Sequence, residues 1–99
     1  MKPIDFHPDA AAEARAVALD YQSIRDELGE DFRTELGQAL ARIQSNPLVY
    51  AADSQSNRTC LLKRFPYAIH YEDLPDRIWV AAVGHVRRRP RYWARRRSS

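Results

Sequence analysis

A stretch of thirteen residues near the end of the sequence, residues 85–97, is the part best suited to chemistry on an anion. It contains seven arginines, one histidine, one tyrosine and one tryptophan, and it contains no acidic residue. Guanidinium groups carry a permanent positive charge and donate paired hydrogen bonds to phosphate or carboxylate groups, while the aromatic rings offer flat surfaces for stacking. We call residues 85–97 the arginine segment and predict that it binds a negatively charged partner.

Four residues are candidates for a catalytic role, namely Arg64, His85, Arg88 and Tyr92. An imidazole titrates near neutral pH, so His85 could transfer a proton. Arg64 and Arg88 could neutralise a phosphate, and Tyr92 could donate a proton. Together these groups would suit acid–base chemistry on a phosphate ester, with Lys63 available to stabilise a nearby oxyanion.

Structural roles are equally open for the same residues. Arg64 could pair across a hairpin with Glu72 or Asp73, a surface contact worth about 0–1 kcal/mol. Tyr92 and Trp93 could serve to anchor the end of the chain to the core, which is the common use of aromatic side chains. The histidine at the strand end is as often a hydrogen-bonded surface residue as a catalyst.

A target-binding role requires no chemistry from the arginine segment. Its charges would act through their summed field and through hydrogen bonds, so that the loss of any one would weaken binding gradually. The residues predicted to bind the target in this way are Arg87, Arg88, Arg89, Arg91, Trp93, Arg95 and Arg96.

The pattern of apolar residues predicts the elements that position these side chains. Lys2–Phe6 is a first strand, Pro8 opens a helix that Gly29 interrupts, and a second helix stops at Asn46-Pro47. The next elements are a loop at residues 51–57, strands at 58–65, 67–72 and 77–83, and a short basic helix from about residue 90. The predicted fold is α+β, with an antiparallel helical hairpin packed on a mainly antiparallel four-stranded sheet.

Composition limits the class of protein. The 99 residues fit one domain, residues 1–99, and a hydrophobic content of 44% excludes a wholly disordered chain. Residues 1–57 hold five basic and ten acidic residues, whereas residues 58–99 hold eleven basic and three acidic ones. Cys60, the only cysteine, is expected to be a small core residue. We expect a cytoplasmic protein without a signal peptide, a membrane span, a cofactor or a metal.

Three stretches of the sequence, in this order, carry a resemblance to a known family. They are Asn46-Pro47 at the end of the hairpin, residues 62–71 (LKRFPYAIHY) across the central strands, and residues 80–93 (VAAVGHVRRRPRYW) at the end. Together they resemble the RelE/ParE superfamily of type II toxin–antitoxin toxins over nearly the whole chain. The resemblance implies a cytoplasmic toxin that arrests growth unless its cognate antitoxin neutralises it in a toxin–antitoxin hetero-oligomer.

Two activities occur on this fold, so the resemblance implies two possible targets. RelE-like members cleave messenger RNA on the ribosome, and ParE-like members inhibit DNA gyrase. By resemblance, Arg64, Tyr92 and, less closely, His85 occupy positions used by the nucleases. The strand at residues 58–65 offers Lys63 and no glutamate as a general base. Its composition therefore slightly favours a ParE-like gyrase inhibitor over a metal-independent endoribonuclease.

Overall fold

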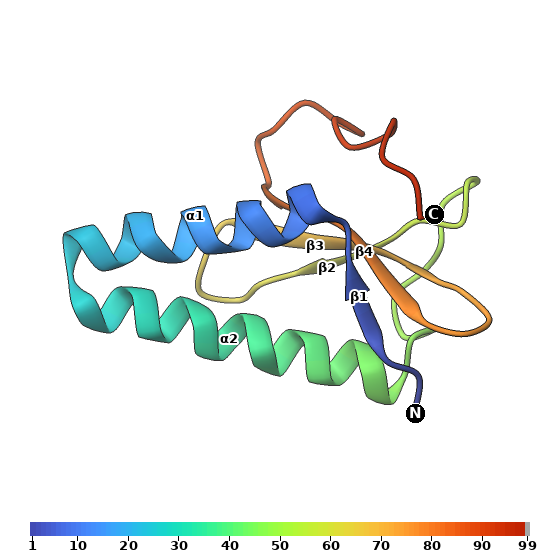
Figure 1. The fold of residues 1–99 in the computed structure, drawn as a ribbon, viewed down its shortest axis with the longest axis horizontal. Coiled ribbons are helices and arrows are strands. Elements are labelled where there is room, and N and C mark those ends of the chain that lie inside the picture. The colour runs from blue at the N-terminus through green and yellow to red at the C-terminus, as the bar shows by residue number, and fades with distance from the viewer. Residues whose placement is uncertain (99) are drawn as a thin grey trace.

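The computed structural model describes residues 1–98, which form four strands and two helices. In chain order they are β1 (Ile4–Phe6), α1 (Pro8–Ile24), α2 (Asp26–Ser45), β2 (Arg58–Leu61), β3 (Tyr67–Asp73) and β4 (Ile78–His85). The strands form one mixed sheet in the order β1-β4-β3-β2, in which β1 is parallel to β4 and the other neighbours are antiparallel. Figure 1 shows α1 and α2 side by side as a hairpin against the sheet. The predicted α+β architecture is confirmed.

The helical hairpin turns at Arg25, whose φ of −163° is extended and separates α1 from α2. At the other end of α1, the Nδ1 atom of His7 accepts a hydrogen bond from the Asp9 N–H at 3.0 Å and caps the helix. The predicted interruption at Gly29 is wrong, because Gly29 is a buried residue within α2. Its role is to allow close packing of the helices, since a Cβ at Gly29 would lie 2.7 Å from the Cβ of Gln22 in α1.

The two glycines of α2 should respond in opposite ways to replacement by alanine. Nothing lies within 4 Å of a Cβ at Gly37, so Gly37→Ala should raise the free energy of unfolding by about 0.5–1 kcal/mol through helix propensity. Gly29→Ala should instead lower it by about 1–2 kcal/mol, because α1 must move away. Urea unfolding of both variants measures the two shifts, and an equal gain in both would contradict the close packing at Gly29.

β2 ends at Leu61 rather than at the predicted Phe65. The cause is Glu35 of α2, whose buried carboxylate accepts hydrogen bonds from the backbone N–H groups of Lys63 and Arg64. These groups are held against α2, so the chain bends before it enters β3. The other three strands are confirmed to within two residues at each end.

The sheet is covered on both faces. The main core lies between the sheet and the helices, where Cys60 is completely buried, as predicted, with Phe32, Ile69 and Tyr71. Ring centroids of Tyr21, Phe32, Phe65 and Tyr67 lie 4.9–6.3 Å apart in this layer. A smaller cluster covers the opposite face and contains Trp79, Ala81, Ala82 and Trp93, with Leu74 and Tyr92 packed against it. The second cluster holds the end of the chain on the sheet.

The arginine segment forms consecutive turns, so the predicted short basic helix from about residue 90 is wrong. Its backbone hydrogen bonds run from the N–H groups of Tyr92, Ala94 and Arg96 to the carbonyl groups of Arg89, Arg91 and Trp93, at 2.8–3.2 Å. Arg91 has a φ of 59°, a left-handed conformation that a right-handed helix cannot contain. Figure 1 shows the segment, in orange to red, above the sheet and beside the beginning of α1.

Candidate functional site

His85 ends β4 and organises the first turn of the arginine segment. Its carbonyl oxygen accepts a hydrogen bond from the Arg88 N–H, and its Nδ1 atom accepts one from the Arg87 N–H, both at 3.0 Å. The ring also packs edge-on against Tyr67, with centroids 5.2 Å apart. Because a neutral imidazole has one acceptor nitrogen, Nε2 carries the proton in this arrangement. A role for His85 as a general base would therefore require the bond to Arg87 to break.

Trp93 is packed against the sheet. It is 9% exposed, and its ring stacks on His70 of β3 with centroids 3.8 Å apart and an angle of 17° between the planes. Trp93 thus anchors the end of the chain to the sheet, which is the structural role considered as the alternative to its predicted contact with a target. Burial disfavours the imidazolium form and lowers the pKa of His70 to about 4, although the charge of Glu13 acts in the opposite direction.

This stacked pair predicts a loss of stability in mildly acidic solution. The pKa of His70 is about 4 in the native state and 6.5 ordinarily, so between these values the unfolded chain binds a proton that the native chain does not. The free energy of unfolding should therefore fall by about 2 kcal/mol between pH 6.5 and 4.5 from this residue. His70→Phe keeps a stacking ring and removes the titration, so its pH profile, measured by urea unfolding, should be flatter. Parallel profiles for the two proteins would contradict this assignment.

The hydroxyl end of Tyr92 packs closely against β4 at Gly84. A Cβ added to Gly84 would lie 2.8 Å from the ring carbons of Tyr92 and closer still to its hydroxyl oxygen, so glycine is required for this contact. The guanidinium of Arg88 covers the ring at 3.8 Å. Burial first, and then the negative charge of Glu13, raise the pKa of Tyr92 to about 12. At neutral pH this phenol is a weak proton donor.

Arg96 is held in an ion pair with Glu13 of α1. Its Nη1 and Nη2 atoms donate to Oε1 and Oε2 of Glu13 at 3.0 and 2.8 Å, and Nη1 also donates to the Ala81 carbonyl at 2.9 Å. The two side chains are 15% and 18% exposed. Burial alone would raise the pKa of Glu13, but the hydrogen bonds from Arg96 and the Val83 N–H outweigh it and lower the pKa. Arg96, which was predicted to bind a target, is therefore engaged with α1 and β4 in this structure.

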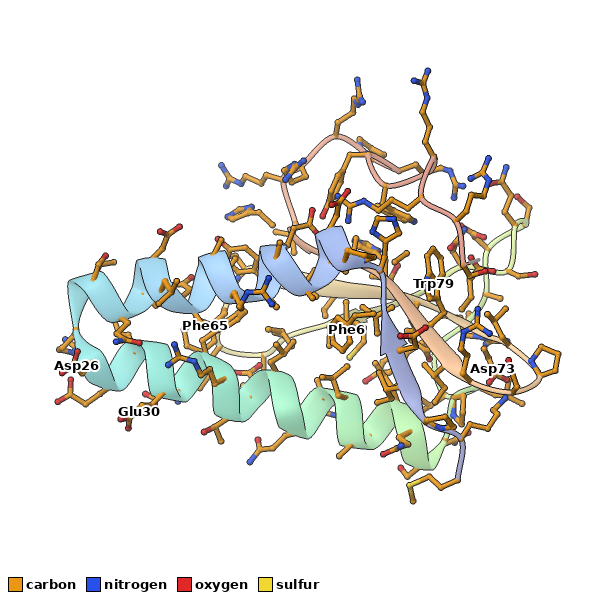
Figure 2. All side chains as sticks on the ribbon, in the orientation of Figure 1. Phe6, Asp26, Glu30, Phe65, Asp73 and Trp79 are labelled. Atoms are coloured by element: carbon orange, nitrogen blue, oxygen red, sulfur yellow. The ribbon has the colours of Figure 1, made fainter. Side chains whose placement is uncertain are left out.

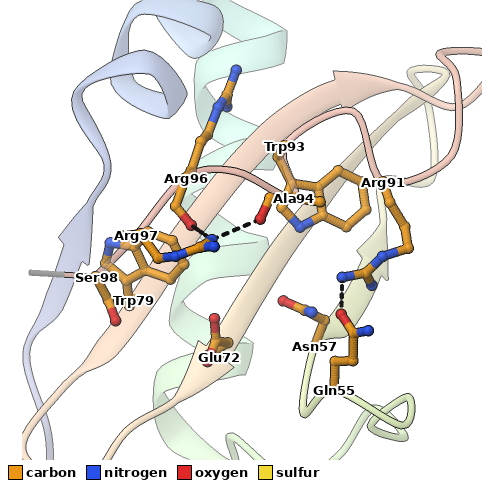
Figure 3. Close-up of a pocket in the computed structure, with 10 residues that line it drawn as sticks. All are labelled: Gln55, Asn57, Glu72, Trp79, Arg91, Trp93, Ala94, Arg96, Arg97 and Ser98. Carbon is orange, nitrogen blue, oxygen red and sulfur yellow. Dashed lines mark hydrogen bonds between the residues drawn. The ribbon is translucent and has the colours of Figure 1, made fainter.

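The remaining arginines divide into exposed and internally bonded groups. Arg91 bonds to Asp53 at 3.1 Å and to Gln55, so it ties the segment to the loop before β2. Figure 3 shows Arg91 reaching toward Gln55, and Arg97 folded back on the carbonyl groups of its own segment. The predicted target-binding residues that the structure leaves exposed are Arg87, Arg88, Arg89 and Arg95.

A hollow of about 170 Å³ lies between the arginine segment and the outer face of β2, β3 and β4. Three of the four candidate catalytic residues line it, namely His85, Arg88 and Tyr92. Its floor and rim also include the half-exposed apolar residues Leu61 and Val86. We call this the outer-face hollow. The outer-face hollow combines positive charge with an apolar surface, which suits a partner that carries both acidic and apolar groups.

Arg64, the fourth candidate catalytic residue, lines a different hollow of about 280 Å³ beside α2, together with Lys63. Its guanidinium bonds to Asp31 at 3.3 Å, so the predicted pairing with Glu72 or Asp73 is wrong. The reason is the bend after β2, which turns the chain toward α2 instead of extending it along β3. The structure thus separates this arginine from the histidine and tyrosine with which it was grouped.

The sequence analysis did not assign three residues to the site that the structure places there. Glu13 pairs with Arg96 across 83 positions, Asp53 pairs with Arg91 across 38, and Gly84 makes room for Tyr92. A glycine inside an apolar strand is a signal of close approach by another group and could have indicated the third contact. The two acidic partners had no such local signal.

The described residues offer neither a membrane-spanning helix nor a metal site. Neither helix in residues 1–98 is long and apolar enough to cross a membrane. Within the same residues, no group of three or more His, Cys, Asp and Glu side chains is placed to hold a metal ion.

Comparison with known proteins gives a likeness in fold. No protein-family model and no curated protein sequence matches this chain. Among solved structures, the fold is similar to a chain of the chromosomal ParDE TA system from P. aeruginosa, with a TM-score of 0.62. The two chains share 15% sequence identity, and the match covers 86% of this chain and 96% of that chain. At this identity the match shows a common fold.

Proposed function

We propose that this protein is the toxin of a type II toxin–antitoxin pair, which arrests growth in the cytoplasm unless its cognate antitoxin binds it. The likeness to a chain of a ParDE system, which extends over 86% of this chain, supports the proposal. The RelE/ParE-like stretches of the sequence support it independently. We further propose that residues 1–99 act as one toxin domain and assemble with the antitoxin as a hetero-oligomer.

The proposed target is DNA gyrase, because the four candidate catalytic residues do not all converge. Arg64 faces a hollow beside α2, while His85 lines the outer-face hollow. Cleavage of a phosphodiester requires charge neutralisation and proton transfer at the same phosphate. An inhibitor that acts by binding requires an exposed positive surface, which Arg87, Arg88 and Arg89 provide. The separation of Arg64 from His85 is the observation on which this choice of target depends.

A RelE-like ribosome-dependent endoribonuclease is the second candidate. It is favoured by one observation, the meeting of His85, Arg88 and Tyr92 in the outer-face hollow. These residues could transfer a proton and neutralise a phosphate without Arg64. In that case His85→Gln should abolish activity by orders of magnitude and leave the fold intact. A gyrase inhibitor should tolerate the same change with a several-fold loss, because His85 then has a structural role in the turn.

Expression without an antitoxin, followed by two measurements, tests the proposal. We expect growth arrest, accumulation of gyrase–DNA cleavage complexes, and loss of supercoiling activity when purified protein is added to gyrase. Primer extension across translated messages should show no cuts positioned by codon. Codon-positioned cuts with normal supercoiling would instead establish the nuclease. Sustained growth at high expression, with neither effect, would contradict a toxin of either kind.

The antitoxin should cover the arginine segment. An acidic, partly disordered segment of the partner could fold on this surface, drawn by the exposed arginines and by the apolar ground of the outer-face hollow. The assembled complex should then neither arrest growth nor inhibit gyrase. Full toxicity of a stable complex would show that the antitoxin binds elsewhere.

A further inference from the structure

One edge of β4 is open over its second half. β1 pairs with Ile78–Val80 alone, whereas β4 continues to His85 and is paired with β3 along its other edge. Backbone groups on an open edge need other partners, and an unprotected edge invites pairing with a foreign strand. Side chains that bond to this edge can therefore protect it and can also hold the arginine segment, which follows β4 in the chain.

Glu13 and Arg96 close the open edge with their side chains. Glu13 accepts the Val83 N–H at 3.0 Å, and Arg96 donates to the Ala81 carbonyl at 2.9 Å. Ala81 is an extra residue in β4, because the register with β3 passes from Ala82 directly to Val80. The ion pair thus joins α1, the bulge of β4 and the end of the arginine segment at one point.

The arginine segment is thus held in place near both of its ends. His85 holds the first turn through its bonds to the backbone of residues 87 and 88, and the Glu13–Arg96 pair holds the last turn. The exposed guanidinium groups lie between these two points. Removing one partner of this partly buried ion pair leaves the other charge without compensation, so the contact should hold the last turn strongly. Figure 2 shows several long side chains on this part of the ribbon projecting away from the helices and the sheet.

We propose that Glu13 and Arg96 are positioning residues that fix the arginine segment in the arrangement presented to its target. This inference rests on the proposed function, in which the exposed arginines contact that target. It assigns a role in activity to an acidic residue of α1 and removes Arg96 from the contact surface. A purely electrostatic view makes the opposite prediction for Glu13, because removal of a negative charge beside a positive surface should strengthen its attraction for an anionic target.

Limited trypsin digestion of Glu13→Gln tests the fastening without reference to any target. Glutamine keeps the shape of the side chain and loses the charge, and the trypsin sites of the chain stay the same. We expect cleavage within residues 87–97 to become at least about tenfold faster, while cleavage at Arg33 and Arg58 stays slow. The matched control is Glu30→Gln, at an exposed position of α2, which should be cut at the rate of the unchanged protein. Mass spectrometry of the fragments locates the cuts.

Growth arrest is the second arm of the experiment. Glu13→Gln should need roughly tenfold more protein for arrest, whereas Glu30→Gln should need no more than the unchanged chain. Equal digestion of the two variants would overturn the inference, as would faster cuts throughout the chain or undiminished arrest after release of the segment. If the unchanged protein itself does not arrest growth, the proposed function fails. The digestion then still decides whether the ion pair fastens the segment.

Discussion

Replacement of Arg87, Arg88 and Arg89 together by glutamine is expected to reduce the potency of growth arrest at least about 100-fold. The three arginines are exposed residues and lie just after β4, so they form the densest part of the proposed contact surface. A loss of about 1 kcal/mol for each contact gives about 3 kcal/mol, or roughly 100-fold in affinity. Each single replacement should reduce potency only several-fold. Dose–response curves from titrated expression, with protein amounts measured by immunoblot, provide the comparison.

The matched control replaces three exposed arginines elsewhere, Arg15, Arg25 and Arg33. Both triple variants take the formal net charge from +3 to zero, so an effect of overall charge would appear in both. Arrest by the control should be close to that of the unchanged protein. A similar loss in both variants would show that net charge, rather than the arginine segment, carries the activity.

The sequence was sufficient for the fold because the main signals are local. Helical spacing of apolar residues and the stop at Asn46-Pro47 predicted a hairpin, and α2 does end at Ser45. Alternating apolar residues identified β3. The position of the hairpin turn was missed because a glycine was interpreted as a helix breaker. Gly29 in fact serves a contact with the other helix, which no local pattern reveals.

The errors after β2 and at the end of the chain have a similar origin. Apolar residues predicted a strand as far as Phe65, but the carboxylate of Glu35, 28 positions from Lys63, turns the chain toward α2. A short basic helix was predicted from about Pro90. Contacts with the sheet, made by Trp93 on His70, hold this stretch as turns instead. In both places tertiary contacts outweigh the local preference of the backbone.

Composition located the candidate site but could not show which of its arginines are exposed. Seven arginines in thirteen residues identified the segment. Which of them are free depends on Glu13 and Asp53, acidic residues that lie far away in the sequence and next to the segment in space. A count of charges treats Arg96 and Arg88 as equivalent, whereas one is fastened to α1 and the other is exposed.

Gly84→Ala is expected to have the second large effect, because it removes the space that Tyr92 occupies. The added Cβ would lie 2.8 Å from ring carbons of Tyr92 and closer to its hydroxyl. The ring must move, and with it the turns that carry the exposed arginines. We expect the free energy of unfolding to fall by about 1–3 kcal/mol and growth arrest to weaken strongly. Urea unfolding and titrated expression measure the two effects.

A double-mutant cycle separates this cause from any defect in β4 itself. Tyr92→Ala alone should lower stability by removing a packed ring, but it also vacates the space above Gly84. In that background Gly84→Ala should cost little or nothing, so the coupling between the two changes should reach at least about 1 kcal/mol. Additive changes in the free energy of unfolding would show that Gly84→Ala destabilises the backbone of β4 itself. Strong coupling would mean that the glycine is required by the docking of the arginine segment, and that the stability of β4 and the presentation of the exposed arginines depend on the same contact.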